Sequence, residues 1–293
     1  MEFAYHNPKS VQELVETLSG LQSYALLAGG TDLLVKMKEK LLRPMPQVIV
    51  DMNRIVGLQE IEELLDGCLR MGALVSHNTA IESSLIKNKA GILAEAASQV
   101  GSPQIRNMGT IGGNICNASP AADTVPALLV LDGIAEVYGN GGRQDIPLTD
   151  LFLGPGRTSL AAGQFISHIK IRQIQTGEGA AFLKIGKRKA LAIAVINCAV
   201  WLKITQGAIE SVRIAMGSVA PTSIRLYTVE QWLVGKPANE EVFAQAGLMA
   251  AQMLKPIDDV RSTARYRTGV ARVIVYRSLA AAFEKSQGRG TCE

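Results

Sequence analysis

The spacing of hydrophobic residues along the chain changes twice and indicates three segments. In the first, residues 1–55, two short apolar runs, "YALLA" and "QVIVDM", flank the amphipathic stretch "TDLLVKMKEKLL". The apolar residues of that stretch recur at helical spacing on one face: Leu33, Leu34, Met37 and Leu41. Ser10 and Glu13 have the spacing of a capping box, which predicts an earlier helix that ends at Gly20. Short strands joined through a helix predict a small parallel sheet.

Between residues 56 and 176 the pattern favours hairpins. "CLRMGALV" predicts a strand, the pair Thr79 and Glu82 predicts a second capped helix, and a further helix is expected over 88–99. "AEVYGNGGRQDIPL" is typical of a hairpin that turns at "GNGG". Alternation along "FISHIKI" would place four side chains on one face of a strand: Phe165, Ser167, Ile169 and Ile171. Hairpins without crossover helices predict an antiparallel or mixed sheet.

After residue 176 long strands come first and helices follow. "AIAVINCAVWLKITQGAIESVRIAMGSV" contains two β-type runs around a "QG" turn, and three helices are expected over 227–234, 239–254 and 262–286. Strands followed by helices predict an α+β layer, with a boundary near residue 177. The expected organisation is a first domain over 1–176 (parts 1–55 and 56–176), a second domain over 177–286, and a tail 287–293.

Composition and charge exclude several classes of function. Of the 293 residues 47% are hydrophobic, 19% charged and only 5% aromatic, and the net charge is +4. Nucleic-acid binding would require a broader basic face interleaved with aromatic residues; the basic clusters at 36–40 and 184–189 are expected to be solvated surface. The stretch "MEFAYHNPKS" lacks a basic start followed by an apolar core, so no signal peptide is expected. The longest apolar run, 190–202, is shorter than the roughly 20 residues of a membrane span, so we expect a cytoplasmic protein with no membrane span.

Cysteine and histidine usage argues against a metal site. Four cysteines lie far apart without a CxxC pair, and the three histidines, His6, His77 and His168, have ordinary surroundings. We therefore predict neither an iron–sulfur cluster nor a zinc ion in this chain, and a bound organic cofactor is expected instead. Cys116 is interpreted as a small buried residue and not as a redox-active thiol.

Two glycine loops of similar character, "AGGTD" at 28–32 and "GTIGGN" at 109–114, carry the main functional signal. A loop between a strand and a helix exposes backbone N–H groups, and glycine lets an anionic oxygen approach them closely. Neither loop matches a P-loop or a G-x-G-x-x-G motif. The carboxylate of Asp32 indicates that backbone donors, not a lysine or an arginine, would neutralise a phosphate. Each loop alone is more often a plain turn, but together they favour a shared pyrophosphate, with Asp123 accepting hydrogen bonds from hydroxyl groups.

Three longer stretches carry a family resemblance: "LLAGGTDLLVKMK", "QVGSPQIRNMGTIGGNICNASPAADTVPALLVLD" and "FLKIGKRKALAIAVINCAV". Together they resemble the FAD-binding (medium) subunit of molybdenum hydroxylases, the xanthine dehydrogenase family, over nearly the whole chain. The resemblance implies an α+β fold: a two-subdomain FAD-binding domain of the PCMH (vanillyl-alcohol-oxidase-like) type, followed by a C-terminal α+β domain of the CO-dehydrogenase-flavoprotein type with an antiparallel sheet and helices.

The resemblance also implies which residues would hold FAD. The first loop would wrap the pyrophosphate by backbone N–H groups, and the second would clasp it from the other side. Asp123 matches the family's acidic FAD contact, Ile166 falls where an apolar residue contacts the flavin, and Lys184 matches a lysine near the flavin, where a positive charge raises the reduction potential. The full cofactor-binding set is Leu26, Leu27, Ala28, Gly29, Gly30, Thr31, Asp32, Thr110, Ile111, Gly112, Gly113, Asn114, Asp123, Ile166 and Lys184. No catalytic residue and no metal ligand is expected.

The function implied is an electron relay. A molybdopterin-binding large subunit would hydroxylate the substrate, a small subunit with two two-iron two-sulfur clusters would pass the electrons, and FAD on this chain would deliver them to NAD or a protein carrier. Ala192 stands where many relatives have an acidic residue, which leaves the acceptor open. Two alternatives remain: a stand-alone FAD-dependent oxidoreductase of the same fold, and a binding module that has lost the cofactor. The first is disfavoured because no histidine here sits in a motif that suggests covalent flavin attachment. The second is disfavoured because both loops, Asp123 and Lys184 are intact.

Overall fold

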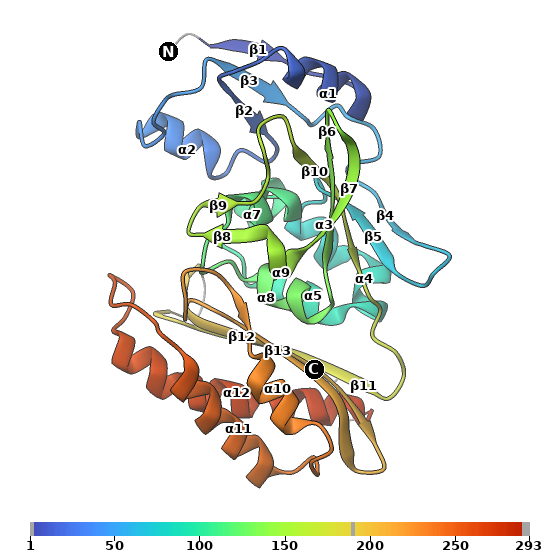
Figure 1. Cartoon of the computed structure of the whole chain (residues 1–293), viewed down its shortest axis with the longest axis vertical. Helices are drawn as coiled ribbons and strands as arrows, with labels where there is room; N and C mark the ends of the chain where they lie inside the picture. Colours follow the sequence, from blue (N-terminus) through green and yellow to red (C-terminus); the bar gives the residue numbers. More distant parts are fainter. Residues whose placement is uncertain (1–2, 189–190, 289–293) are drawn as a thin grey trace.

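Three larger sheets succeed one another along the long axis of the molecule, and a fourth sheet of two short strands accompanies them. The computed structural model describes residues 3–188 and 191–288. Figure 1 shows the N-terminal sheet at one end, a helix-covered sheet in the middle and a long-stranded sheet with its helices at the other end. Cys292, most of the predicted tail 287–293 and Lys189 of the basic cluster 184–189 lie outside the described residues.

The N-terminal sheet is parallel, as predicted, with the strand order β1-β3-β2. Strand β1 was not anticipated. The elements of this part are β1 (Ala4–His6), α1 (Val11–Ser19), β2 (Tyr24–Leu27), α2 (Leu33–Lys38) and β3 (Val48–Asp51).

The two helices of this part test the predicted start and stop signals. Helix α1 begins after Ser10, whose hydroxyl accepts the N–H of Glu13 at 3.1 Å, and it ends at Gly20, as predicted. Helix α2 is shorter than its apolar pattern suggested. It ends at Lys38 because the chain enters a left-handed conformation at Lys40, with φ 54°. Of the predicted apolar face only Met37 is buried; Leu34 and Leu41 are exposed.

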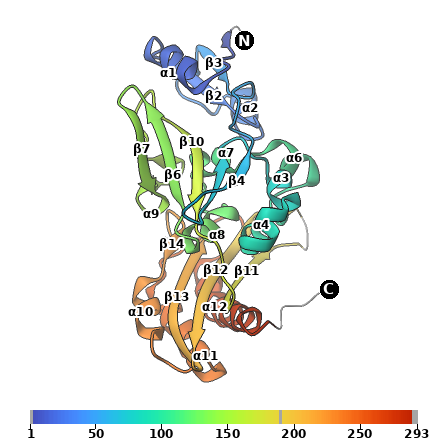
Figure 2. The same cartoon turned by 90° about the vertical axis from the view of Figure 1, so that its right-hand side faces the viewer.

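The middle sheet is antiparallel throughout, with the order β4-β5-β10-β6-β7, in agreement with the hairpin prediction. Six short helices come between β5 and β6 in the chain (Figure 2). The elements are β4 (Ile61–Glu63), β5 (Leu69–Gly72), α3 (His77–Glu82), α4 (Ser84–Lys89), α5 (Gly91–Ser98), α6 (Pro103–Met108), α7 (Ile111–Asn117), α8 (Thr124–Val130), β6 (Ile134–Gly139), β7 (Gly142–Pro147), α9 (Leu148–Leu151), β8 (Phe152–Gly154), β9 (Arg157–Thr158) and β10 (Phe165–Ile171).

Two details of this part differ from the sequence prediction. The cap of α3 is Ser76, which accepts the N–H of Thr79 at 3.0 Å, so the predicted Thr79–Glu82 capping box is wrong by one turn. The register of β10 against β6 shifts between Ile166 and His168. This bulge interrupts the alternation, so that Ile166 joins Ile169 and Ile171 in the middle core while Phe165 packs in the N-terminal cluster.

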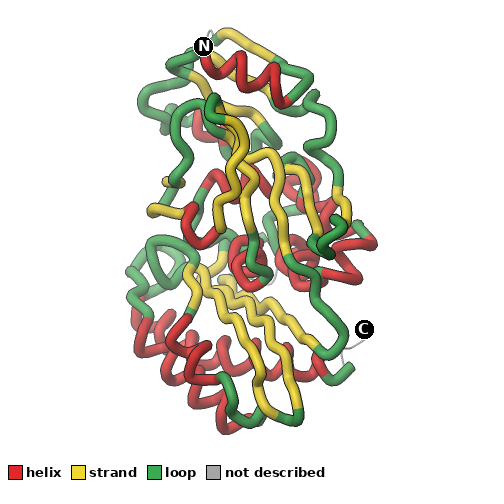
Figure 3. Tube along the Cα trace, turned by 45° about the vertical axis from the view of Figure 1, so that its right-hand side comes forward, coloured by secondary structure: helices red, strands yellow, loops and turns green. Residues whose placement is uncertain are grey.

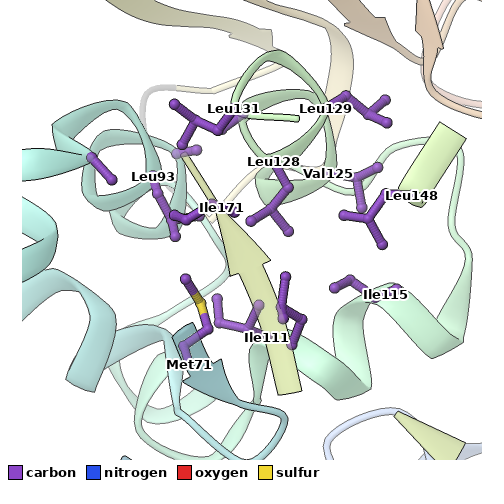
Figure 4. Packing of buried hydrophobic residues seen from close by; sticks show 14 of the residues in the cluster. Met71, Leu93, Ile111, Ile115, Val125, Leu128, Leu129, Leu131, Leu148 and Ile171 are labelled. Carbon is purple, nitrogen blue, oxygen red and sulfur yellow. The ribbon is translucent and has the colours of Figure 1, made fainter. Parts of the chain in front are cut away.

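The middle core fixes the second glycine loop. Ile111 and Ile115 of α7 are fully buried and point into the same cluster as Met71, Leu128 and Ile171 (Figure 4). Burying a side chain of this size stabilises the fold by about 1.5–3 kcal/mol. The start of α7 is therefore held by its own apolar face, and the loop that precedes it cannot move independently of the core.

The third sheet has the order β11-β12-β13-β14 and is antiparallel, as predicted. One face packs against α5 and α8, and the other against the terminal helices (Figures 1 and 3). The predicted strands around the "QG" turn and the three predicted helices are present. The elements are β11 (Glu178–Gly186), β12 (Ala194–Thr205), β13 (Ala208–Gly217), β14 (Ile224–Arg225), α10 (Tyr227–Leu233), α11 (Glu240–Met253) and α12 (Ala264–Ser286).

Candidate functional site

The two glycine loops, eighty residues apart in the sequence, touch each other. The first follows β2 and leads into α2, and the second leads into α7. A Cβ atom at Gly29 would lie 1.8 Å from the carbonyl oxygen of Met108 and 3.0 Å from Cα of Gly109. Gly30 has φ +70°, a left-handed conformation that favours glycine. The glycines of the first loop are therefore required by this close approach and by the turn.

A cavity of about 340 Å³ opens between the loops, and we call it the central cavity. Its volume falls in the range of small-molecule sites. It is lined by Leu26, Ala28, Gly29, Gly30, Thr31, Asp32, Leu33, Lys36, Leu42, His77, Val100, Ile105, Gly109, Thr110, Gly113, Asn114, Cys116 and Asn117. Most residues of both predicted loops therefore line the same cavity.

The first loop presents unpaired backbone donors to this cavity. Within residues 3–188 and 191–288, none of the N–H groups of residues 29–33 donates a hydrogen bond to the protein; the first N–H of the helix that does so is that of Leu34, to Gly30 at 3.0 Å. Backbone donors that lack a partner need water or a ligand to satisfy them. Five consecutive free donors next to a concave surface are suited to an anion with several oxygens.

The second loop differs, because all but one of its backbone donors are already used. The N–H of Ile111 donates to Val75 and that of Gly112 to Ala73, both at 2.9 Å. The N–H of Gly113 donates to the Thr110 hydroxyl at 3.0 Å, and that of Asn114 donates to the Thr110 carbonyl at 2.9 Å. What this loop has left for a ligand is the backbone N–H of Thr110, which donates to no described residue, together with the Thr110 hydroxyl proton and the amide of Asn114.

The side chains of the central cavity carry almost no net charge. Lys36 pairs with Asp32 at 2.5 Å and also donates to Oδ1 of Asn117 at 2.8 Å. The amide oxygen of Asn114 accepts the hydroxyl of Thr124 at 2.8 Å, which leaves its NH₂ group as a donor toward the cavity. An anion bound here would therefore be held by dipoles and N–H groups, with the lysine charge already balanced by Asp32.

A second cavity of about 190 Å³, the inner cavity, adjoins the first and shares Leu26, Ala28, Gly113 and Cys116 with it. Its wall is mostly apolar and includes Ile166 together with Leu74, Met52, Leu160 and Phe165. The prediction that Cys116 is a small buried residue is wrong: its side chain is exposed at the junction of the two cavities. Desolvation by the surrounding protein raises the pKa of this thiol, so it stays protonated at neutral pH.

Asp123 and Lys184 form a buried ion pair behind these cavities. Nζ of Lys184 lies 2.5 Å from Oδ2 of Asp123, and the two side chains are 6% and 8% exposed. Asn197 donates to the other carboxylate oxygen at 3.0 Å, and Lys184 also donates to the carbonyl of Gln99 at 2.8 Å. Burial raises the pKa of Asp123, an effect that Lys184 and Asn197 oppose. Asn197 is a residue that sequence reasoning did not single out.

Lys184 also lines a third cavity of about 380 Å³, between the segment 98–106 and the end of β11, which we call the interface cavity. Arg106 and Arg188 line it as well, so that it is basic. Ala192, the departure from the family pattern, stands on its wall. Since residues of the segment 99–106 line both this cavity and the central one, that segment separates the two.

Some predicted residues contribute to the site only indirectly. Leu27 and Ile111 line none of these cavities: Leu27 contacts the position where a Cβ of Gly30 would stand, and Ile111 is core. Gly112 lines the inner cavity, and its lack of a side chain is needed for packing, because a Cβ would lie 2.5 Å from that of Ala73. These positions shape the loops instead of presenting groups to a ligand.

His77 is the residue whose surroundings the sequence misjudged. Its ring lines the central cavity, although it is only 2% exposed and makes no side-chain hydrogen bond in the described chain. A lone histidine after a strand carries no motif, so only the fold reveals its position. Among the described residues there is no cluster of three or more His, Cys, Asp or Glu side chains suited to a metal ion, and no helix is long and apolar enough to span a membrane.

Comparison with known proteins identifies the family. Residues 1–172 match the model of the FAD binding domain in molybdopterin dehydrogenase, and residues 181–282 match the CO dehydrogenase flavoprotein C-terminal domain. The carbon monoxide dehydrogenase medium chain of Hydrogenophaga pseudoflava is 35% identical over 97% of this chain and 98% of its own length. The nicotine 6-hydroxylase medium subunit of Paenarthrobacter nicotinovorans is 32% identical over 94% of this chain and 95% of its own length.

Solved structures agree with the sequence matches. A chain of the carbon monoxide dehydrogenase of Hydrogenophaga pseudoflava superimposes with a TM-score of 0.93 and covers 97% of this chain and 98% of its own. The fold class, the oxidoreductase class and the FAD cofactor predicted from the sequence are confirmed. The chain belongs to the FAD-binding subunits of the molybdenum hydroxylase family.

Proposed function

We propose that this chain holds FAD along the three cavities and relays electrons from iron–sulfur clusters of a partner subunit to an acceptor. The observation that carries the proposal is the central cavity, which is lined by residues 29–33 with their five free N–H groups and by Thr110 and Asn114 of the second loop. FAD supplies the redox chemistry when bound, because it takes up electrons singly and releases them as a pair. The residues of this chain bind it, orient it and set its electrostatic surroundings.

The central cavity suits the pyrophosphate. The N–H groups of the first loop would donate to its oxygens from one side, and the Thr110 hydroxyl and the Asn114 amide from the other. A cavity whose one lysine is already paired with Asp32 would hold the diphosphate by neutral donors, which agrees with the expectation drawn from Asp32. Leu26, Ala28 and Gly113 would bridge the central and inner cavities along the cofactor.

The two ring systems of FAD would lie at opposite ends of this arrangement. Ile166 lines the inner cavity and Lys184 the interface cavity, so one ring would not touch both. We place the isoalloxazine past the segment 99–106, toward Lys184, and the adenine in the mostly apolar inner cavity. Ile166 would then contact the adenine and not, as the resemblance implied, the flavin. Asp123 would then act through its ion pair with Lys184, holding the ammonium group in place.

The proposed partners follow from the family. They are a molybdopterin-binding large subunit and a small subunit with two-iron two-sulfur clusters, in a heterotrimeric complex in the cytoplasm. The basic wall of the interface cavity, with Arg106, Lys184 and Arg188, supports an anionic or acidic acceptor, either NAD or a protein carrier. The domain division near residue 177 fits this arrangement, since the interface cavity takes its walls from both sides of that position.

A visible absorption spectrum of the purified chain, before and after addition of FAD, tests the proposal. We expect flavin bands at stoichiometric occupancy without an iron–sulfur shoulder. The same spectrum on the complex isolated from cells should add the iron–sulfur bands. A complex that contains flavin but no iron–sulfur absorption would contradict the relay, and absence of flavin from both samples would contradict the cofactor site.

A further inference from the structure

The buried imidazole of His77 is an unpaired polar group in the wall of the central cavity. His77 opens α3, and its backbone N–H donates to the Gly109 carbonyl at 3.0 Å, which ties the residue to the second loop. Its side chain is 98% buried, and neither ring nitrogen makes a hydrogen bond in the described chain. Nδ1 has almost no surface that solvent could reach, whereas Nε2 belongs to the small exposed part of the ring.

The ring stands close to the free donors of the first loop. A Cβ atom placed on Gly109 would lie 3.3 Å from Cδ2 of His77 and 3.4 Å from the hydroxyl oxygen of Thr31. The imidazole and the Thr31 hydroxyl therefore flank the same point. Thr31 belongs to the stretch 29–33 whose N–H groups are unpaired, so the ring and these donors border one volume.

The ring is neutral and has one N–H group to donate. Burial, together with the charge of Arg106, lowers the pKa of His77 to about 4. A buried N–H donor without a partner is rarer in proteins than an under-satisfied acceptor, so the tautomer with the proton on Nε2, the nitrogen that is not enclosed, is favoured. That tautomer would present a donor to the cavity without burying a positive charge.

We propose that His77 is a phosphate-binding residue of this site, whose Nε2–H group donates a hydrogen bond to a pyrophosphate oxygen of FAD. The inference rests on the proposed function and deepens it. It adds a side-chain donor from α3 to the backbone donors of the first loop. It also gives a partner to a polar ring that is buried without one.

Binding of ADP and riboflavin separates the phosphate contact from the flavin contact. ADP contains the diphosphate without the isoalloxazine ring, and riboflavin contains the ring without phosphate. In the full chain, His77→Leu should weaken both FAD and ADP about tenfold or more, the loss typical of a hydrogen bond to a charged group, and leave riboflavin unchanged. His77→Gln, which keeps a donor, should recover part of the affinity. His6→Leu, at an exposed position on β1, is the matched control and should change neither.

Imidazole ¹⁵N chemical shifts of the wild-type chain provide a reading that does not depend on how well a variant folds. Addition of ADP should shift the Nε2 resonance of His77 and leave that of His6 in place. Unchanged ADP affinity of His77→Leu, or an unmoved His77 resonance in a chain that binds ADP, would overturn this inference and leave the proposed function standing. A wild-type chain that bound neither ADP nor FAD would overturn both.

Discussion

The contact between the two glycine loops can be tested by adding one methyl group to it. Gly29→Ala would place a Cβ 1.8 Å from the carbonyl oxygen of Met108 and 2.6 Å from its carbon. Real Cβ atoms do not approach another atom below 3.0 Å, so one of the loops must move by more than 1 Å. The second loop is anchored by the buried Ile111 and Ile115, and the Met108 carbonyl in front of it is part of the backbone and cannot rotate away as a side chain could. We therefore expect the first loop to move.

The size of the effect follows from what the first loop does. It carries the unpaired donors of residues 29–33, and their directions would change together. Overpacking of this kind costs about 1–3 kcal/mol. If that cost falls on the bound state, the FAD dissociation constant rises between about fivefold and 150-fold, at 1.4 kcal/mol for each factor of ten. The fold should persist, because no core side chain is changed.

Flavin fluorescence titration of the purified chain measures this constant, and thermal unfolding of the apo chain checks the fold. Gly91→Ala is the matched control: a Cβ there has no atom within 4 Å, and the position opens α5. The control should bind FAD like the wild type. If Gly29→Ala also bound FAD with wild-type affinity and unfolded at the wild-type temperature, the close approach of the two loops, and the reasoning built on it, would be wrong.

Three further predictions concern other parts of the site and the fold. Lys184→Met should lower the reduction potential of bound flavin, and it should destabilise the chain by about 3–5 kcal/mol because Asp123 is left as an unpaired buried carboxylate. In urea unfolding, the double variant with Asp123→Asn should recover most of that loss. No recovery would show that the two residues are not coupled. Cys116→Trp should block FAD binding with little change in unfolding temperature, whereas Cys116→Ala should bind normally; equal loss in both would mean that the side chain does not face the cavity. Arg261 holds the pKa of Asp259 below its usual range, so the free energy of unfolding should fall as the pH drops below about 4. The fall should be weaker in Asp259→Asn, and identical pH profiles of the two chains would contradict this assignment.

The fold was largely predictable because its elements have strong local signals. The hairpin at "GNGG", the long strands around the "QG" turn and the terminal helices follow from turn residues and periodicity. The misses occurred where tertiary structure overrides the local pattern. Helix α2 ends early at a left-handed Lys40, and the bulge near Ser167 changes which residues of β10 share a face. Neither feature has a signal in a single sequence, because each depends on what the segment packs against.

The site was predictable to the level of loops but not of atoms. Glycine spacing and family resemblance brought both loops to one cavity, yet they suggested that each loop donates N–H groups. Which donors are free depends on partners far away in the sequence, such as Val75 and Ala73 for the second loop. The same reason hid His77, whose interest lies only in what surrounds it. Asn197 likewise gains a role because β12 passes behind Asp123.

The two loops differ in how many of their backbone N–H groups are already bonded to the protein, and this indicates different roles in binding and in positioning the ligand. In the second loop, every N–H from Ile111 to Asn114 is bonded to the protein, and the side chains of Ile111 and of Ile115, which follows the loop, are buried in the core. Such a loop is rigid and has little left to give to a ligand. The first loop is joined to the core mainly through short strands and keeps its donors free. The first loop would then provide most of the affinity for the diphosphate, and the second loop would determine where the diphosphate lies. Substitutions that loosen the second loop, such as truncation of Ile115, should misplace the flavin relative to Lys184 more than they release it.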